Sequence, residues 1–430
     1  MNRKIAVVEF QRIVANSDIN GVKITPEDIE QLNQFNFKNE GSKFDDFINP
    51  IKNGVQFKNY IGVLTTKTGL TIEILPKIYG TNSLDESKKL ALEMIENSLK
   101  VSGKLFDASN MQVGNNNLIE IFIDMFLKEV KSICDRGLVS DYLTVEENNN
   151  FLKGKLMFSK HIKYNSVNRS RFYTEYSEYA VDNEPNRLIK KALIYLSNKQ
   201  NSARINKKIN DLLIFFEKVN HHILKSDSFV DNINRKFAYY ENGLKWARLI
   251  LNNISFQTYS GNHFSFAFLF PMEKLYEEYV YMKLKNSQPT CISILAQESK
   301  YSLFNKRNDK EYNKYRLKPD LVVRSQTDNE VIIMDTKWKI LKKEGPTQVD
   351  LYQMYAYFTR YKQFNEKVKK VVLLYPYTDS FQPTTFKSLN YQQDNEVVIE
   401  VAFINFFEED WIQKLWYNIL ENKGQYIENE

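Results

Sequence analysis

Several features are scarce in this 430-residue chain, and each scarcity excludes a class of protein. Its two cysteines, Cys134 and Cys291, lie far apart without metal-ligand spacing, so neither a zinc site nor a disulfide framework is expected. No apolar run approaches the roughly 20 residues of a membrane span. The apolar run that follows Met1 is too short for a signal peptide. We therefore expect a cytoplasmic protein with no membrane partner.

The chain also lacks the glycine-rich loop GxxxxGK(S/T) that cradles nucleotide phosphates, so any nucleotide hydrolysis must belong to a partner. Its excess of positive charge is small, because 59 basic residues are offset by 53 acidic residues. A net charge of +6 is compatible with DNA contact but does not argue for it. Hydrophobic residues make up 43% of the chain, which is enough for a sizeable core and excludes global disorder.

The length predicts two or three domains. Residues 1–82 indicate a β-rich N-terminal domain, with strands expected over 4–10, 57–66 and 70–76. Thr25 before Pro26 predicts a helix start.

Residues 83–260 indicate a mostly helical middle region, with helical periodicity over 84–101, 117–136 and 186–220. A projecting hairpin near residues 145–175 is our prediction for contact with a partner, and an ordinary surface loop is the alternative.

Residues 261–430 show an alternation of helices and strands that suits a mixed central sheet with helices on its faces. The expected elements are helices over 272–286, 348–362 and 409–420, strands over 292–297, 370–375 and 396–406, and a hairpin over 320–337.

The hairpin carries the most informative residues of the chain. Two apolar runs, 321–323 and 331–334, read as strands joined by a polar turn over 325–329. Positions equidistant from the turn face each other in an antiparallel pair. The midpoint between Asp320 and Asp335 lies within that turn, so these two residues should face each other. Strand alternation places Lys337 on the same face as Asp335. The hairpin thus predicts two carboxylates and an ammonium at one edge of a small sheet.

Such a site suits a divalent metal and a phosphate. Mg²⁺ is usually held by one or two carboxylates together with water and substrate phosphate, so Asp320 and Asp335 are the expected ligands. The backbone carbonyl of Thr336 is a plausible third ligand. Lys337 can orient an attacking water or hold a phosphate oxygen. A solvated hairpin with an incidental salt bridge is the alternative, but the apolar flanks and the centred turn favour the functional interpretation.

Two helices flank this hairpin in the sequence. Glu277 or Glu278, on the expected helix 272–286, could reach the metal, although a lone glutamate on a helix is more often solvated. Gln353 and Tyr357 are four residues apart and share a helix face, so both could contact a phosphate or the attacking water. A core tyrosine and a capping glutamine explain that pair about as well when it is taken alone.

The order of these motifs resembles the PD-(D/E)xK nuclease superfamily: a helix glutamate, Pro319-Asp320, Asp335-Thr336-Lys337, then Gln353-x-x-x-Tyr357. More narrowly, it resembles the McrC family, the nuclease subunits of McrBC-type modification-dependent restriction systems. Further segments that match the McrC family lie at 69–78, 151–155, 176–190 and 270–277.

The resemblance implies a restriction-endonuclease-like α/β core at the C-terminus of an α+β multidomain chain. It implies that Asp320 and Asp335 bind Mg²⁺, that Lys337 is the catalytic lysine, and that Glu277 matches the helix acid better than Glu278 does. It also implies a partner, a McrB-like AAA+ GTPase hexamer, which binds GTP, reads modified DNA and is stimulated by this subunit.

The resulting hypothesis is a Mg²⁺-dependent endodeoxyribonuclease subunit that hydrolyses phosphodiester bonds within a GTP-driven antiviral restriction complex. One alternative is a non-catalytic factor that only assembles or activates the motor. Another is a stand-alone structure-specific nuclease that cuts without GTP or a partner.

Overall fold

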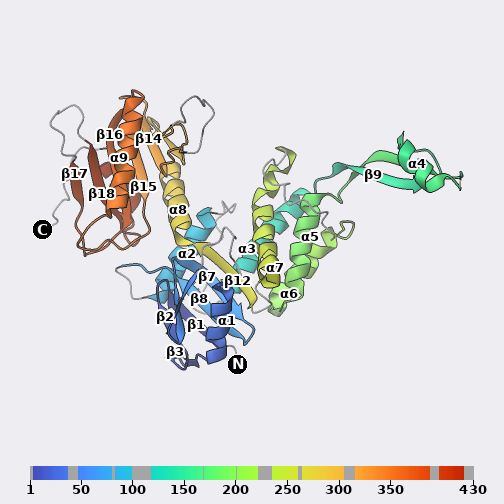
Figure 1. Cartoon of the computed structure of the whole chain (residues 1–430), viewed down its shortest axis with the longest axis horizontal. Helices are drawn as coiled ribbons and strands as arrows, with labels where there is room; N and C mark the ends of the chain where they lie inside the picture. The colour runs from blue at the N-terminus through green and yellow to red at the C-terminus, as the bar shows by residue number, and fades with distance from the viewer. Residues whose placement is uncertain are drawn as a thin grey trace.

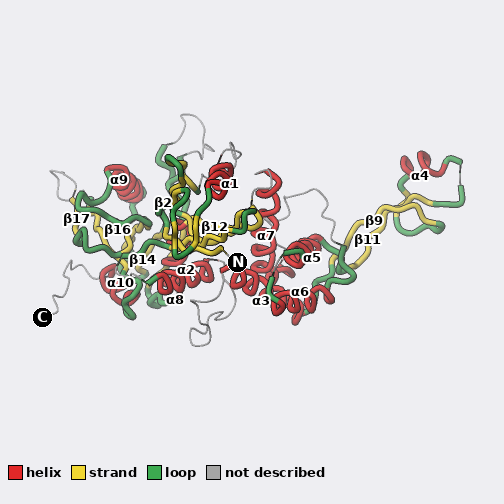
Figure 2. The backbone as a smooth tube through the Cα atoms, turned by 90° about the horizontal axis from the view of Figure 1, so that it is seen from below, coloured by secondary structure: helices red, strands yellow, loops and turns green. Residues whose placement is uncertain are grey.

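The structure, a computed structural model, describes residues 3–36, 47–79, 83–98, 118–167, 169–199, 201–220, 235–259, 264–304, 315–387 and 397–420. These residues form an elongated α+β molecule (Figure 1). The N-terminal sheets lie between a C-terminal sheet on one side and a helical region on the other, from which a long arm projects (Figures 1 and 2). No helix in this described part of the chain has the length and apolar character needed to cross a membrane.

The N-terminal region is β-rich, as predicted. Its main sheet contains, in spatial order, β1 (Arg3–Val8), β8 (Leu70–Leu75), β7 (Tyr60–Thr66) and β12 (Phe264–Pro271). Beside it lie a three-stranded sheet and a two-stranded ribbon, made by β2 (Arg12–Val14), β6 (Gly54–Phe57) and β5 (Ile48–Ile51), and by β3 (Asp18–Ile19) and β4 (Val22–Lys23). Helix α1 (Pro26–Asn36) begins where predicted, because Thr25 Oγ1 accepts the Asp28 N–H at 3.2 Å.

Strand β12 lies far along the chain from the sheet that it joins. The expected boundary near residue 261 falls outside the described residues, and β12, which follows it, pairs with β7. Gly62 on β7 permits this pairing, since a Cβ there would lie 1.9 Å from the carbonyl oxygen of Phe268. Strand β12 therefore ties the start of the C-terminal region to the N-terminal sheet.

The middle region is mostly helical. Its helices are α2 (Leu84–Ser98), α3 (Leu118–Arg136), α5 (Glu184–Ser197), α6 (Ala203–Phe215), the 3₁₀ helix η1 (Arg235–Tyr240) and α7 (Glu241–Tyr259). The stretch with helical periodicity over 186–220 forms two helices, because cap-forming residues interrupt it: Asn198 caps the end of α5 and Ser202 precedes α6. Positions 99–101 and 117 of the expected helices lie outside the described residues.

The expected hairpin is present as a projecting ribbon, and it is longer than predicted. Strand β9 (Asp141–Asn149) pairs antiparallel with β11 (Phe172–Ala180) along their whole length. The tip carries β10 (Lys155–Leu156) and α4 (Phe158–Asn165). None of the described hydrophobic residues from 141 to 180 belongs to any of the three buried clusters of the molecule. We call residues 141–180 the arm (Figure 2).

The C-terminal region is built on the predicted mixed sheet. Its six strands are, in spatial order, β13 (Ile292–Ala296), β14 (Leu321–Ser325), β15 (Glu330–Thr336), β16 (Lys367–Pro376), β18 (Val398–Ile404) and β17 (Thr384–Lys387). Strands β15, β16 and β18 are parallel, and the remaining pairs are antiparallel. The helices are α8 (Met272–Asn286), α9 (Gln348–Gln363) and α10 (Trp411–Leu420). Position 396 of an expected strand lies outside the described residues.

Strand alternation divides this sheet between two buried layers. On β15, Ile332 and Met334 join the cluster that contains α8 and α10, whereas Val331 and Ile333 join the cluster that contains α9. Odd-numbered side chains of β15 therefore face α9. The same phase places Asp335 on the α9 side of the sheet.

Candidate active site

The hairpin has the predicted register. Leu321 lies opposite Met334 and Arg324 lies opposite Val331, which continues to Asp320 opposite Asp335. Asp320 Oδ2 accepts hydrogen bonds from the backbone N–H of Thr336 at 2.7 Å and from its Oγ1 at 2.8 Å. Both acids thus lie at the same edge of the sheet, where β15 ends.

Lys337 and Gln353 surround the carboxylate of Asp335. Lys337 Nζ forms an ion pair with Asp335 Oδ2 and donates to Gln353 Oε1 at 3.0 Å. Gln353 Nε2 donates to Asp335 Oδ1 at 3.2 Å. These contacts fix the orientation of the Gln353 amide, because its oxygen must face the ammonium and its nitrogen the carboxylate. Gln353 comes from α9, the helix that covers this face of the sheet.

Tyr357 extends this network by one step. Its hydroxyl accepts a hydrogen bond from Gln353 Nε2 at 2.8 Å and donates to the backbone carbonyl of Lys318 at 3.1 Å. Tyr357 is 4% exposed, so it combines core packing with a polar contact. The predicted face shared by Gln353 and Tyr357 is therefore directed at the acids.

The two candidate glutamates of α8 have different surroundings. Glu277 is half-buried, and burial together with the negative charge of Asp320 raises its pKa. Glu278 is exposed and accepts a hydrogen bond from Ser98 of α2 instead. Glu277 is thus the glutamate of the pair that faces the site.

Sequence reasoning missed Gln297, which connects Glu277 to the hairpin. Its side-chain amide donates to Glu277 Oε1, and its backbone N–H donates to the carbonyl of Asp320 at 2.9 Å. Gln297 directly follows β13, which pairs with β14. The expected strand 292–297 included this residue, but nothing in the sequence indicated which strand it would pair with.

The site carries more negative than positive charge. Burial and the nearby charge of Asp320 raise the pKa of Asp335 to about 7, although Lys337 opposes the shift. Burial also raises the pKa of Asp320, against the hydrogen bonds from Thr336. Burial disfavours the Lys337 ammonium, but the charges of Asp335, Asp350 and Asp320 outweigh it and raise the pKa of Lys337. Asp320 and Asp335 therefore need a positive charge in addition to that of Lys337 if both are to be ionised at the same time.

The arrangement fits a Mg²⁺ ion held by two carboxylates. Asp335 Oδ2 is buried and contacts the Lys337 ammonium as an ion pair, and both hydrogen bonds to Asp320 end on Oδ2. No group of three or more His, Cys, Asp or Glu residues in the described ranges is arranged to hold a metal. Mg²⁺ does not require one, because water and phosphate complete its octahedron. The contacts of Thr336 described above use its N–H and hydroxyl, so a role for its carbonyl stays a prediction.

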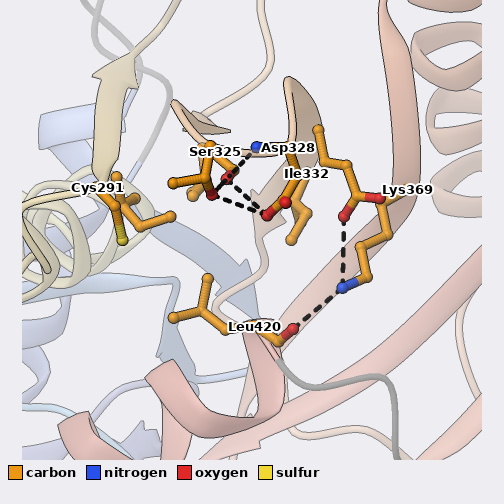
Figure 3. Close-up of a pocket in the computed structure, with 10 residues that line it drawn as sticks. Cys291, Ser325, Asp328, Ile332, Lys369 and Leu420 are labelled. Carbon is orange, nitrogen blue, oxygen red and sulfur yellow. Dashed lines mark hydrogen bonds and ion pairs between the residues drawn. The ribbon is translucent and has the colours of Figure 1, made fainter.

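The other end of the hairpin has a different character. A cavity of about 210 Å³ lies beside the turn, lined by Ser325, Asp328, Lys369 and Leu420 among others (Figure 3). Asp328 Oδ2 accepts from Ser325 Oγ at 3.1 Å, and Lys369 Nζ donates to the carbonyl of Leu420 at 3.0 Å. The polar groups of this cavity are thus paired among themselves, and the length of β15 separates it from the acids.

The family described as "McrBC 5-methylcytosine restriction system component" matches residues 55–376. None of the curated proteins matches the chain.

Two solved structures from Thermococcus gammatolerans are similar to this chain. One, an assembly of McrB AAA+ hexamers with bound McrC, matches with a TM-score of 0.59 and 20% sequence identity, over 97% of this chain and 100% of the other. The other, a McrBC complex, matches with a TM-score of 0.47 and 20% identity, over 67% of this chain and 88% of the other. The first match shows a McrC-like fold.

Proposed function

The chain belongs to the McrBC 5-methylcytosine restriction system component family, and from that premise we propose that it is a Mg²⁺-dependent endodeoxyribonuclease. It would act as the cutting subunit of a complex that a McrB-like AAA+ GTPase hexamer drives. The observation that carries the proposal is the convergence of Asp320, Asp335 and Lys337 at one sheet edge, with Gln353 bonded to two of them.

Each side chain has a role that follows from its contacts. Asp320 and Asp335 would hold the Mg²⁺ ion, which when bound lowers the pKa of a water and stabilises charge on the phosphodiester. Lys337 presents an ammonium at the same edge, where it orients the attacking water or binds a phosphate oxygen. Gln353 holds that ammonium in place, and Tyr357 holds Gln353. Glu277, which faces Asp320 from α8, adds a further oxygen acceptor for water around the metal.

The proposal assigns GTP to the partner. Support comes from the fold match to McrC bound to McrB hexamers and from the family itself. The arm is the proposed partner contact, because it projects from the body and exposes large apolar side chains. The most exposed of these are Tyr142, Phe151, Phe158, Ile162, Val167 and Tyr179. Exposed apolar residues gathered on one element are typical of protein interfaces.

A cleavage assay on DNA with and without 5-methylcytosine tests the proposal, using the full chain, its McrB-like partner, GTP and Mg²⁺. We expect Asp335→Ala to abolish cleavage and to leave stimulation of the partner GTPase intact. Asp328→Ala is the matched control, since Asp328 lies in the same hairpin but at the turn. Cleavage by Asp335→Ala at the wild-type rate would discard the assignment.

The same assay separates the two alternative functions. A factor that only activates the motor gives no Mg²⁺-dependent cleavage with any partner, while it still stimulates GTP hydrolysis. A stand-alone nuclease cuts plain DNA ends without GTP or the partner.

A further inference from the structure

A buried glutamate of the N-terminal sheet contacts the residue that follows the candidate catalytic lysine. Glu9 comes directly after β1 and is 1% exposed. Its Oε1 accepts hydrogen bonds from the indole Nε1 of Trp338 at 2.7 Å and from the backbone N–H of Lys77 at 2.9 Å. Trp338 immediately follows Lys337 in the chain. The contact therefore joins the first strand of the molecule to the end of the hairpin.

Trp338 is the anchor of this part of the backbone. Its indole lies on the α8 side of the sheet, where its ring centroid is 5.3 Å from that of Tyr276 and 6.2 Å from that of Phe406. Strand alternation directs Lys337 to the opposite side, toward α9. The Lys337 N–H makes its own sheet bond to the carbonyl of Leu374 at 2.9 Å. A fixed indole at 338 thus fixes the backbone from which the ammonium projects.

A second contact joins the same two regions. Tyr79, in the segment after β8, lies with its ring centroid 6.2 Å from that of Tyr377 and hydrogen-bonds to Asp379. Tyr377 follows β16, the strand beside β15. The segments after β1 and β8 therefore contact the segments after both strands that border the site.

We propose that Glu9 is a positioning residue of the nuclease site: by accepting the indole N–H of Trp338, it holds Lys337 in register with Asp320 and Asp335. The N-terminal sheet is then part of the support of the active site. This inference rests on the proposed function, because it assigns Glu9 to the same reaction.

The chemistry of the contact predicts which substitution preserves it. Only Oε1 takes part, and Glu9 Oε2 is buried without a hydrogen-bond partner in the described residues. Glutamine offers the same single carbonyl oxygen, so Glu9→Gln keeps both hydrogen bonds. Leucine offers none and leaves the indole and the Lys77 N–H unpaired.

The experiment uses the full chain with its McrB-like partner, GTP, Mg²⁺ and DNA containing 5-methylcytosine. We expect Glu9→Leu and Trp338→Phe each to lower kcat of cleavage about tenfold or more, with KM for DNA and GTPase stimulation nearly unchanged. We expect the double variant to lose no more cleavage activity than either single variant, because both substitutions remove the same contact between Glu9 and Trp338. Glu9→Gln keeps kcat within about threefold of wild type.

A matched control separates positioning from general loss of stability. Glu73 is a buried acid of the same sheet that bonds Lys88 at 3.2 Å and lies on β8, away from Trp338. We expect Glu73→Gln to lower the melting temperature and to leave kcat unchanged. A second readout is backbone amide exchange in residues 335–341, which Glu9→Leu should accelerate and Glu9→Gln should not.

Several results would overturn the inference. Cleavage by Glu9→Leu at the wild-type rate would do so, as would an equal loss in Glu9→Gln and Glu9→Leu, or parallel losses of cleavage and GTPase stimulation. If Asp335→Ala also cleaves in the same assay, the proposed function itself fails. Amide exchange then decides alone whether Glu9 supports this segment.

Discussion

Two antiparallel ribbons in this molecule share a hydrogen-bonding pattern and differ in everything around it. The hairpin of β14 and β15 is covered on both faces, so that Ile333 on the α9 side and Met334 on the α8 side are each 0% exposed. The arm packs against no buried cluster of the molecule, and Tyr142 and Tyr179 are 71% and 64% exposed. Burial holds side chains in one place, which catalysis requires, whereas exposure leaves apolar surface for a partner.

The arm is held together by contacts across its own strands. Tyr142 and Tyr179 lie directly opposite each other, with ring centroids 5.1 Å apart. Asn148 and Asn165 exchange two amide hydrogen bonds of 2.8 Å between β9 and α4. Contacts of this kind contribute roughly 0.2–1 kcal/mol per pair, so no single residue of the arm decides its fold.

The largest expected difference between the ribbons is in catalysis. Lys337→Gln removes the ammonium from the site and leaves a neutral polar side chain, and we expect cleavage to fall on the order of 1000-fold. GTPase stimulation stays at the wild-type level, because the arm is unchanged. Lys367→Gln is the control, since Lys367 is an exposed lysine at the start of β16 that pairs with Glu330. Cleavage by Lys337→Gln at the wild-type rate would contradict a catalytic role for the buried hairpin.

A second prediction concerns stability. Ile333→Ala creates a cavity between the sheet and α9, which should lower the free energy of unfolding by about 2–4 kcal/mol. Tyr142→Ala in the arm should lower it by less than about 1 kcal/mol, because the ring stays largely in water in the folded protein. Urea unfolding of both variants measures the contrast. Equal losses would show that the arm is folded against a core after all.

The sequence was sufficient to predict the hairpin and its register. Local turn residues and alternation placed Asp320 opposite Asp335, and the structure has that register. Helix α8 begins and ends at the predicted residues, since its apolar stripe and the preceding proline are local signals. Local patterns sufficed wherever the partner strand or helix was a neighbour in the chain.

The sequence was insufficient where distant segments meet. Glu9 and Trp338 are 329 positions apart. Glutamate is usually exposed, and no periodicity in the sequence indicates that Glu9, directly after β1, is buried against an indole. Gln297 was missed because the pairing of β13 with β14 depends on a long connection. Similarly, β12 continues into α8 yet pairs with β7. Each of these contacts depends on tertiary packing rather than on local propensity.

A third prediction compares two carboxyl groups: that of Glu9, which contacts the end of the hairpin, and that of Glu147, in the arm. Burial raises the pKa of Glu9 from 4.5 to about 7, so the folded protein keeps a proton that the unfolded chain releases. The stabilisation is complete below pH 4.5 and is lost as the pH rises to about 7, with a slope of up to about 1.4 kcal/mol per pH unit. Glu9→Gln has no such loss.

Urea unfolding between pH 5 and 8 therefore checks Glu9. The advantage of Glu9→Gln over wild type should grow toward pH 7 and then level off. Glu147 in the arm is the control, because it is exposed and the Tyr176 hydroxyl lowers its pKa. Glu147→Gln should leave the pH dependence of stability nearly unchanged. Parallel curves for wild type and Glu9→Gln would contradict the assignment of a buried, proton-binding carboxyl.

The smallest expected effect concerns the exposed tip of the arm. Phe158 and Ile162 are 69% and 66% exposed and lie one turn apart on α4. Replacing both by serine removes apolar surface without opening a core, so the melting temperature should not change. If the tip binds the partner, GTPase stimulation falls about tenfold, equivalent to roughly 1.4 kcal/mol of lost binding. Ser159→Ala on the same helix serves as the control, and unaltered stimulation by the double variant would place the partner contact elsewhere on the molecule.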